Sequence, residues 1–440
     1  MLNYMISDEP IELKKAIKMG FKFVADNPSI IAFVSKLSSY NDEPKLYQYS
    51  SYVKDGSNSM KEEESTASGI SFKRKNAVIK LLGEAIERYS LTTNNNVNLI
   101  YKNFNELNSD GKFLINPQNI SQLDDGIASR DILSTKLHWM KGKSLMSNNE
   151  ILVPAQLIYV PYTYSNSEPY LQIPISTGAA AGTSLVSAIY RGICEVIERD
   201  SFMIHYLNKI HSPLIDMQDL AKKDKDINKI MAILNRYKLE LFILDITTDL
   251  GMPSFTAIIL DKTGLGPAVS VGLKSGFNIK QNIIGAIEES LMTRSWIRDK
   301  FIYMEPNYKR EKIIRTIEDR AHFWFNIRSI KYLDFWLKNN NVKKINKNSL
   351  KQFKNEYQFT TKLLKDKKIE AIYIDITNKK IKKYNFVVVK VIIPQLQPLY
   401  LDERYPYLKN KRLYEVPVEM GVFKKAKTIS QLNKIPHPFL

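Results

Sequence analysis

The hydrophobic positions of residues 176–201 change their spacing partway along this stretch. Its first part, Ser176–Gly182 (STGAAAG), holds only small side chains, so a ligand can approach the backbone closely and we expect a loop. Beyond it, apolar residues recur at three- and four-residue steps, which predicts an amphipathic helix: Ala188, Ile189, Ile193 and Ile197. Glu195 and Glu198 are three residues apart on this helix, so their carboxylates share one face.

The rest of the chain mixes helical and strand patterns without a regular βαβ rhythm. Helical patterns cover residues 10–19, 73–90, 216–237, 278–303 and 322–337. Apolar runs predict strands at residues 151–159, 239–246, 254–260, 267–272, 369–376 and 386–393, and a further strand beginning near residue 138. The polar run Glu62–Gly69 (EEESTASG) is typical of a loop. We therefore expect an α+β architecture of mixed sheets and helices.

The composition limits the cellular compartment and the binding partners that we expect. The 440 residues contain no apolar run long enough to span a membrane, and the single cysteine, Cys194, cannot form an internal disulfide, so we expect a cytoplasmic protein with a buried thiol. The formal charge of +18 suggests nucleic acid as a binding partner. Lysine is spread along the chain with Asn and Ile, however, and no nucleic-acid-binding motif occurs, so we expect nucleic acid not to be the substrate.

A duplicated Glu-x-x-Glu-Arg motif is the strongest candidate for chemistry. One copy holds Glu84, Glu87 and Arg88, and the other holds Glu195, Glu198 and Arg199. Four carboxylates that converge on one site would repel each other unless cations intervene, and Mg²⁺ prefers such oxygen ligands and commonly bridges them to phosphates. The guanidinium groups could then hold phosphate oxygens. The alternative is a solvated charged helix face, which each motif taken alone would favour.

Other common sites lack support in the sequence. The histidines show no metal-ligand spacing, so we expect structural roles for them: His138, His205, His211, His322 and His437. No Ser-His-Asp or Cys-His arrangement is recognisable. The two commonest glycine-rich nucleotide-binding signatures are absent as well. Any nucleotide site must therefore be of a different kind.

The motifs, taken together, resemble those of the YcaO family. The resemblance rests on GEAIERYS (83–90), STGAAAG (176–182), CEVIERD (194–200) and EESLMTR (288–294), with supporting matches at LDIT (244–247), GMP (251–253) and VIIPQLQP (391–398). It covers the chain from about residue 65 to the end. It implies a fold of mixed sheets and helices around a cleft that binds ATP through bridging Mg²⁺. We accordingly expect a YcaO-like catalytic domain over residues 65–440, preceded by an extension (1–64) that could bind a partner or a leader peptide.

The resemblance also implies roles for individual residues. The Mg²⁺ ligands would be Glu84, Glu87, Glu195 and Glu198. Residues that contact the nucleotide or its phosphates would be Arg88, Ser176, Gly178, Arg199, Glu289 and Arg294. Four positions depart from the family pattern: Thr177, where Asn is usual; Ser187, where many members carry Glu; Met292, where Gln is common; and Ile70, where Lys is frequent.

The C-terminus points to a subfamily. Members that cyclise peptide side chains often end in a Pro-x-Pro-x-Pro tail that inserts towards the active site. This chain keeps two of the three prolines, Pro436 and Pro438, and has Leu440 in place of the third. We expect this tail to take part in catalysis; the alternative is an ordinary disordered end. The implied activity is an ATP-dependent cyclodehydratase that activates a backbone amide and turns Cys, Ser or Thr of a ribosomal precursor peptide into azolines.

The same resemblance implies partners and leaves alternatives. The expected partners are the precursor peptide, a separate ThiF-like leader-binding protein, a later flavin dehydrogenase and a second copy of the chain as a homodimer. One alternative keeps the ATP site but admits external sulfide and forms thioamides. Another is a non-catalytic ATP-binding scaffold subunit, which the departures at Ser187 and Met292 favour.

Overall fold

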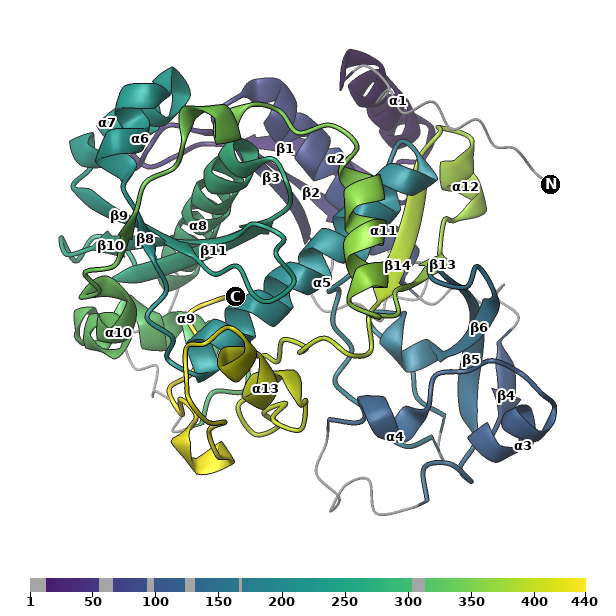
Figure 1. The fold of residues 1–440 in the computed structure, drawn as a ribbon. Helices are drawn as coiled ribbons and strands as arrows, with labels where there is room; N and C mark the ends of the chain where they lie inside the picture. The colour runs from purple at the N-terminus through teal and green to yellow at the C-terminus, as the bar shows by residue number, and fades with distance from the viewer. Residues whose placement is uncertain (1–12, 55–65, 93–98, 123–130, 166–167, 303–312) are drawn as a thin grey trace. The chain divides into compact units, whose positions relative to one another are not determined.

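The structure is a computed structural model that describes residues 13–54, 66–92, 99–122, 131–165, 168–302 and 313–440. The chain forms two compact units (Figure 1). The first comprises Met1–Ser38, Leu46–Val196 and Tyr357–Gln395, and the second comprises Ser39–Lys45, Ile197–Glu356 and Leu396–Leu440. One helix, α5 (Leu185–Leu207), runs from the first unit into the second. Within the described residues, no helix combines the length and apolar character needed to cross a bilayer.

A three-stranded antiparallel sheet and two helices open the first unit. The sheet order is β1 (Ile31–Leu37), β2 (Tyr47–Val53), β3 (Thr66–Ser71). Helix α2 (Arg74–Leu91) packs on β3 so closely that a Cβ at Gly69 would lie 2.2 Å from the carbonyl oxygen of Ala77. Helix α1 (Leu13–Asp26) packs on α2, where a Cβ at Gly20 would lie 2.7 Å from Leu82. Glycine is therefore what permits both contacts.

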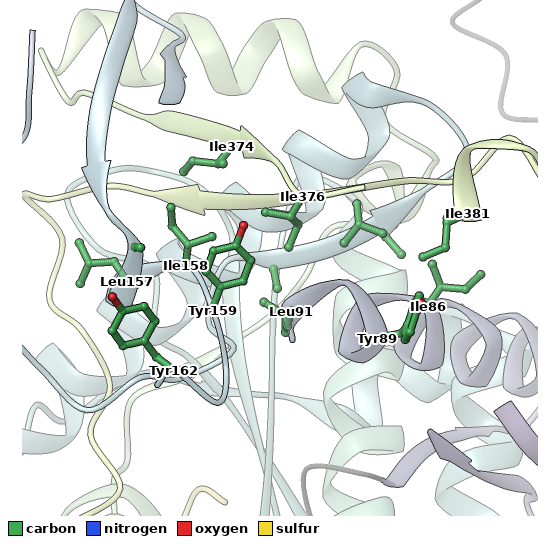
Figure 2. Packing of buried hydrophobic residues seen from close by; sticks show 14 of the residues in the cluster. Ile86, Tyr89, Leu91, Leu157, Ile158, Tyr159, Tyr162, Ile374, Ile376 and Ile381 are labelled. Carbon is green, nitrogen blue, oxygen red and sulfur yellow. The ribbon is translucent and has the colours of Figure 1, made fainter. Parts of the chain in front are cut away.

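The second sheet of the first unit is built from strands distant in sequence. Its order is β4 (Ile100–Lys102), β5 (Leu137–Ser144), β13 (Ile372–Asp375), β14 (Val387–Ile392), β7 (Ala179–Gly182), and β6 (Glu150–Pro154) also pairs with β5. Short helices border it: α3 (Phe104–Ser109), α4 (Pro117–Ile120), α11 (Glu356–Asp366), α12 (Lys379–Lys382) and the 3₁₀ turn η1 (Ala155–Leu157). Figure 2 shows side chains of the core, in which Ile86 and Tyr89 of α2 lie near Ile381, and Leu91 at the end of α2 lies near Ile376.

The second unit is organised around a five-stranded sheet and one long helix. The sheet order is β11 (Val269–Ser275), β10 (Ser254–Asp261), β9 (Leu239–Asp245), β8 (Leu214–Ile215), β12 (Val342–Lys343). Helix α8 (Ile279–Ile302) lies against β11 (Figure 1), and a Cβ at Gly272 would lie 2.2 Å from the carbonyl oxygen of Ala286. The other elements are α6 (Met217–Lys223), α7 (Lys225–Arg236), α9 (Ile317–Phe325), η2 (Ile327–Leu333), α10 (Asp334–Leu337), η3 (Lys347–Leu350), α13 (Arg412–Glu419) and η4 (Ile429–Gln431).

The expected α+β architecture is confirmed, and four local predictions need correction. The strand expected over 151–159 ends at Pro154, after which Ala155–Leu157 form a 3₁₀ turn. Residues 66–69, expected in a loop, belong to β3, and residues 179–182 of the expected small-residue loop form β7, which pairs with β14. Their small side chains mark close contact with neighbouring backbone and not loop structure. The helix expected over 216–237 is two helices, because Asp224 ends α6 and its side chain caps α7 at the amides of Asp226 and Ile227.

Two features bear on the expected organisation of the chain. Strands β1 and β2 lie in the segment expected to be an extension, yet β2 pairs along its length with β3 in one sheet. The described part of the first predicted helix begins at Leu13 and continues past residue 19 to Asp26. Cys194 is buried, as its sequence context indicated.

Candidate functional site

Helix α2 presents the first Glu-x-x-Glu-Arg motif in the first unit. One carboxylate oxygen of Glu84 accepts a hydrogen bond from the amide of Ser68 in β3 at 3.1 Å. The other accepts from Nε of Arg88, one turn along the helix, at 2.9 Å. The strand and the following helical turn thus fix the direction in which Glu84 points.

Glu87 of α2 lies among the other carboxylates of the first unit. Burial raises the pKa of Glu87 well above its usual range, and repulsion from Glu195 and Glu84 raises this pKa further, against the smaller opposing effects of Arg88 and Lys390. Glu195 lies on α5 and accepts a hydrogen bond from the amide of Gly178 at 3.3 Å. Three carboxylates from two helices therefore interact, and this is the oxygen donor chemistry that Mg²⁺ binds.

The turn that precedes β7 is the part of the predicted loop that remains. It is closed by the amide of Ala179, which donates to the carbonyl oxygen of Ser176 at 2.8 Å. Gly178 has φ +86°, and a Cβ there would lie 2.1 Å from the carbonyl oxygen of Val391. Only glycine fits this position, and its amide is aimed at Glu195.

Lys390 is a member of this region that sequence reasoning missed. It lies in β14, is 2% exposed and donates a hydrogen bond to the carbonyl oxygen of Ile175 at 2.6 Å. Burial lowers its pKa to about 8, although Glu195 and Glu87 act in the opposite direction. The available signal was a lysine inside the continuous β-branched run VVVKVII, where an apolar side chain would be usual.

The second unit holds the remaining predicted acidic residues. Glu198 is 1% exposed; it accepts from the amide of Ser275 at 3.0 Å and pairs with Arg199 at 2.9 Å. Glu289 of α8 accepts from the amide of Leu273 at 2.5 Å and lies 4.0 Å from Arg199. Burial raises the pKa of Glu289, and Glu198 raises it further, while Arg199 lowers it. Arg199 thus interacts with two carboxylates of its own unit.

The C-terminal tail is held in place within the second unit. The carbonyl oxygen of Pro436 accepts hydrogen bonds from Tyr206 at 3.0 Å and from the indole of Trp324 at 3.2 Å. The carbonyl oxygen of His437 accepts from Arg320 at 2.8 Å. His437, Pro438 and Phe439 are buried, and Leu440 is half-buried. The alternative of a disordered end does not describe this tail.

One contact joins the tail to the acidic residues of the second unit. The guanidinium carbon of Arg199 lies 4.0 Å from the centre of the Phe439 ring. This is the distance at which a cation is attracted to the face of an aromatic ring. Arg199 therefore contacts Glu198 and the tail at once.

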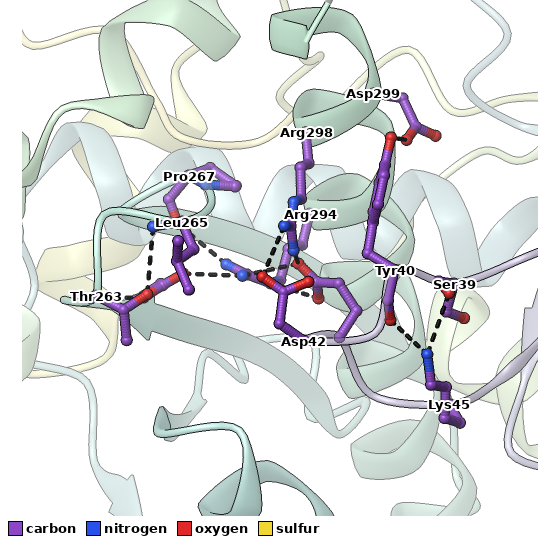
Figure 3. Close-up of polar contacts among 12 residues, drawn as sticks. Ser39, Tyr40, Asp42, Lys45, Thr263, Leu265, Pro267, Arg294, Arg298 and Asp299 are labelled. Carbon is purple, nitrogen blue, oxygen red and sulfur yellow. Dashed lines mark hydrogen bonds and ion pairs between the residues drawn. The ribbon is translucent and has the colours of Figure 1, made fainter.

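Arg294, expected to bind phosphate, lies instead in a buried ion-pair cluster of the second unit. Its guanidinium donates twice to Glu43, each time at 2.9 Å, and once to Asp261 at 2.8 Å. Arg298, one turn along α8, pairs with Glu43 and with Asp42. Figure 3 shows both arginines directed from α8 at the segment that carries Tyr40 and Asp42. Nothing in the sequence signals this pairing, because Glu43 and Arg294 are 251 residues apart.

Two departures from the family pattern have structural explanations. The hydroxyl of Ser187 donates to the carbonyl oxygen of Ser184, and the amide of Ser187 donates to the Ser184 hydroxyl at 3.2 Å, so the two serines stabilise the beginning of α5. Ile70 is buried in β3.

In the part of the chain that the structure describes, no three or more His, Cys, Asp or Glu side chains form a group already arranged to hold a metal ion.

Comparison with known proteins agrees with this chemistry. Residues 68–397 match the family described as YcaO cyclodehydratase, which binds ATP and Mg²⁺. An uncharacterized protein of Methanothermobacter thermautotrophicus is 23% identical over 310 residues, which cover 67% of this chain and 75% of that protein.

Solved structures show the same fold. A heterocyclase in complex with substrate and cofactor aligns with a TM-score of 0.78 at 19% identity, covering 96% of this chain and 57% of the heterocyclase. This chain thus spans little more than half the length of that enzyme. YcaO from Methanopyrus kandleri, bound with AMPPCP and Mg²⁺, aligns with a TM-score of 0.63 at 14% identity, covering 90% and 94% of the two chains. The chain belongs to the YcaO family, whose ligands are ATP and Mg²⁺.

Proposed function

We propose that this chain is an ATP-dependent cyclodehydratase that converts Cys, Ser or Thr residues of a ribosomally made precursor peptide into azolines. The observation that carries the proposal is the position of Arg199, which pairs with Glu198 at 2.9 Å and contacts Phe439 of the tail at 4.0 Å. One side chain thus connects a candidate metal ligand with the tail that is typical of cyclising family members. Family membership supplies the ATP chemistry.

The Mg²⁺ ligands that we propose are the four glutamates of the duplicated motif: Glu84, Glu87, Glu195 and Glu198. Burial raises the pKa of Glu87 most and repulsion from Glu195 and Glu84 raises it further; this supports the assignment, because a bound cation would offset both effects. Mg²⁺, when bound, would stabilise negative charge that develops on the transferred phosphoryl group. To ligate it, Glu84 and Glu195 would exchange their present contacts with Arg88 and the Gly178 amide for the cation.

Other residues would hold the nucleotide. Arg88 and Arg199 can each present a planar fork of donors to phosphate oxygens. The turn formed by Ser176 and Gly178 offers backbone that a nucleotide can approach closely, and Glu289 would lie near the nucleotide. The contacts of Arg294 with Glu43 and Asp261 favour a role in fixing α8 over direct phosphate binding.

The proposed reaction balances as the loss of one water from the peptide. The thiol or hydroxyl of the substrate side chain gives up its proton to a base, attacks the carbonyl carbon of the preceding residue and forms the ring bond. The carbonyl oxygen takes the γ-phosphoryl group of ATP, and ADP leaves. Loss of the phosphorylated oxygen as inorganic phosphate, together with the amide proton, leaves the C=N bond of the azoline. Pro436, Pro438 and Leu440 belong to the tail that would position the peptide or the proton acceptor for this step.

The partners that we propose follow from the family resemblance. A separate ThiF-like protein would bind the leader of the precursor peptide and deliver it to this chain. A flavin dehydrogenase could then oxidise azolines to azoles, and the chain could form a homodimer. The neighbouring heterocyclase, whose structure holds substrate and cofactor, supports heterocycle formation as the class of reaction.

The test is the intact mass of the precursor peptide after incubation with this protein, its partner, ATP and Mg²⁺. Loss of one water per modified residue, abolished by Glu198→Gln, is the expected result. Glu240→Gln is the matched control, because Glu240 is an exposed residue of β9 that pairs only at the surface with Lys262. Exchange of oxygen for sulfur when sulfide is supplied would establish thioamide formation instead. Unchanged peptide mass with no ATP turnover would leave the scaffold alternative.

A further inference from the structure

Lys390 is the one lysine that is buried among the described residues. It occupies the middle of β14, opposite Ile374 of β13 on one side and opposite Ala179 of β7 on the other. A lysine in the interior of a sheet, between two paired strands, loses the hydration of its ammonium group. Such a residue is retained only where nearby groups compensate for that loss.

The compensating groups belong to the candidate nucleotide site. The ammonium donates to the carbonyl oxygen of Ile175 at 2.6 Å, and its positive charge interacts with Glu195 and Glu87. The same interaction lowers the pKa of Glu87, which burial and neighbouring carboxylates otherwise raise. Lys390 is therefore, together with Arg88, a resident cation of the acidic group that would receive Mg²⁺.

The backbone beside Lys390 fixes the turn that precedes β7. Ile175 stands directly before Ser176, and the amide of Val391 donates to the carbonyl oxygen of Gly178 at 2.7 Å. Lys390 and Val391 thus contact the two ends of residues 175–178 from one strand. The amide of Gly178 in turn donates to Glu195. A short network of hydrogen bonds thus links the Lys390 ammonium, the turn and the Glu195 carboxylate.

We propose that Lys390 is a positioning residue that balances the charge of Glu87 and Glu195 in the metal-free chain and ties these carboxylates to the nucleotide-binding turn. This inference rests on the proposed function, because it takes Glu87 and Glu195 as metal ligands. It assigns Lys390 no contact with the reacting atoms. The charge of Lys390 should weaken metal binding, and its hydrogen bond to the turn should strengthen nucleotide binding. A residue with a purely structural role would affect both ligands in the same direction.

Removal of the ammonium should have opposite consequences for metal and nucleotide. Lys390→Met keeps the length of the side chain but removes the positive charge, so a divalent cation meets stronger negative potential and should bind roughly tenfold more tightly, the scale of coupling between interacting sites. The turn loses its anchor at Ile175, so nucleotide binding should weaken. A residue that only fills the core would weaken both ligands together.

The experiment titrates Mn²⁺ into the full chain and follows free Mn²⁺ by electron paramagnetic resonance, because Mn²⁺ shares the oxygen ligands of Mg²⁺. AMPPCP affinity is then measured at saturating Mn²⁺. Lys390→Met is compared with Lys390→Arg, which keeps the charge, and with Lys141→Met, an exposed lysine of β5 in the same sheet. Tighter Mn²⁺ with weaker AMPPCP in Lys390→Met alone supports the inference. Unchanged or weaker Mn²⁺ binding overturns it, whereas failure of the wild-type chain to bind Mn²⁺ and AMPPCP overturns the proposed function with it.

A stability measurement covers the case in which Lys390→Met folds poorly. In a double-mutant cycle on the metal-free chain, Lys390→Met should cost less stability when Glu195 is already Gln, because the carboxylate that interacts most with the ammonium is gone. The denaturation midpoint by urea gives this difference at temperatures where all four proteins are folded. Equal losses in both backgrounds would show that Lys390 does not balance Glu195.

Discussion

Two charge clusters of this chain combine carboxylates with cations to different ends. In the second unit, Arg294 and Arg298 are matched by Glu43, Asp261 and Asp42 at 2.6–2.9 Å. In the first unit, Glu84, Glu87 and Glu195 face Arg88 and Lys390, and the pKa of Glu87 stays raised because burial and repulsion exceed what these cations supply. Both clusters set three carboxylates against two cations. We call the second-unit cluster balanced because each of its carboxylates pairs directly with an arginine, and we call the first-unit cluster unbalanced because the pKa of Glu87 stays raised. The unbalanced cluster is what a divalent cation would complete.

The largest expected effect separates the two clusters by function. Glu87→Gln should reduce Mg²⁺-dependent ATP turnover by about a thousandfold, a typical loss when one preorganised electrostatic contact to a transition state is removed. The same change should leave the stability of the metal-free chain unchanged or raised, because it removes a repelling carboxylate. Turnover and the urea midpoint are measured on one preparation. A loss of stability in parallel with the loss of turnover would contradict the comparison.

The next largest effect is expected in the balanced cluster, where a substitution should reduce stability and leave ATP binding unchanged. Arg294→Met leaves Glu43 and Asp261 buried without their shared cation, so the free energy of unfolding should fall by about 3 kcal/mol. ATP affinity of the folded variant should stay close to that of the wild type. Urea denaturation and nucleotide titration measure the two quantities. Strongly weakened ATP binding at full stability would instead restore the phosphate role that the sequence suggested for Arg294.

Low pH should reduce the stability of the second unit, because it protonates the buried neutral histidine His205. Burial lowers the pKa of His205 from its ordinary 6.5 to about 4, and its Nδ1 lies 2.7 Å from the Ser212 hydroxyl. Because the unfolded chain binds the proton more readily, this neutral histidine contributes stability that is present above pH 6.5 and is lost as pH falls towards 4. Between pH 6.5 and 5 the loss should be about 2 kcal/mol. Urea midpoints of wild type and His205→Gln across this range should converge as the pH falls; a constant difference would argue against a neutral buried imidazole.

The smallest expected effect concerns the contact between Arg199 and the tail. Phe439→Leu keeps an apolar side chain but removes the ring face, which should cost about 1 kcal/mol, or roughly fivefold in kcat/KM for the peptide. Affinity for AMPPCP, measured as a control, should change less. Equal losses for peptide and nucleotide would indicate that Phe439 stabilises the second unit as a whole and does not act on the peptide.

The sequence was informative where local pattern and local contacts agree. Helix α2 follows from the spacing of its apolar residues, and β14 follows from its β-branched run. The duplicated motif led to Glu84 and Glu87 because residues three and four apart share a helix face. The small residues of β3 and β7 predict a loop but form strands, because Gly69 lies against Ala77 and Gly182 lies against Ala188, and no local pattern reveals these contacts.

The two cations that most alter the picture could not have been placed from sequence. Arg294 meets Glu43 from across 251 residues of chain, so its family motif suggested a ligand where the fold supplies a protein carboxylate. Lys390 is distinguished by burial, and burial depends on β7 and β13 pairing on both sides of its strand. Charge balance is a property of the folded chain, and the difference between the two clusters emerges only there.

The most direct test of this difference is Mn²⁺ binding to the full chain in the presence of AMPPCP, compared between Glu87→Gln and Glu150→Gln. Glu150 is an exposed residue of β6 in the same unit, paired with Lys141 at the surface. If the unbalanced carboxylates hold the cation, Glu87→Gln loses Mn²⁺ binding and Glu150→Gln retains it. Retained Mn²⁺ affinity in Glu87→Gln would contradict the assignment of this cluster as the metal site.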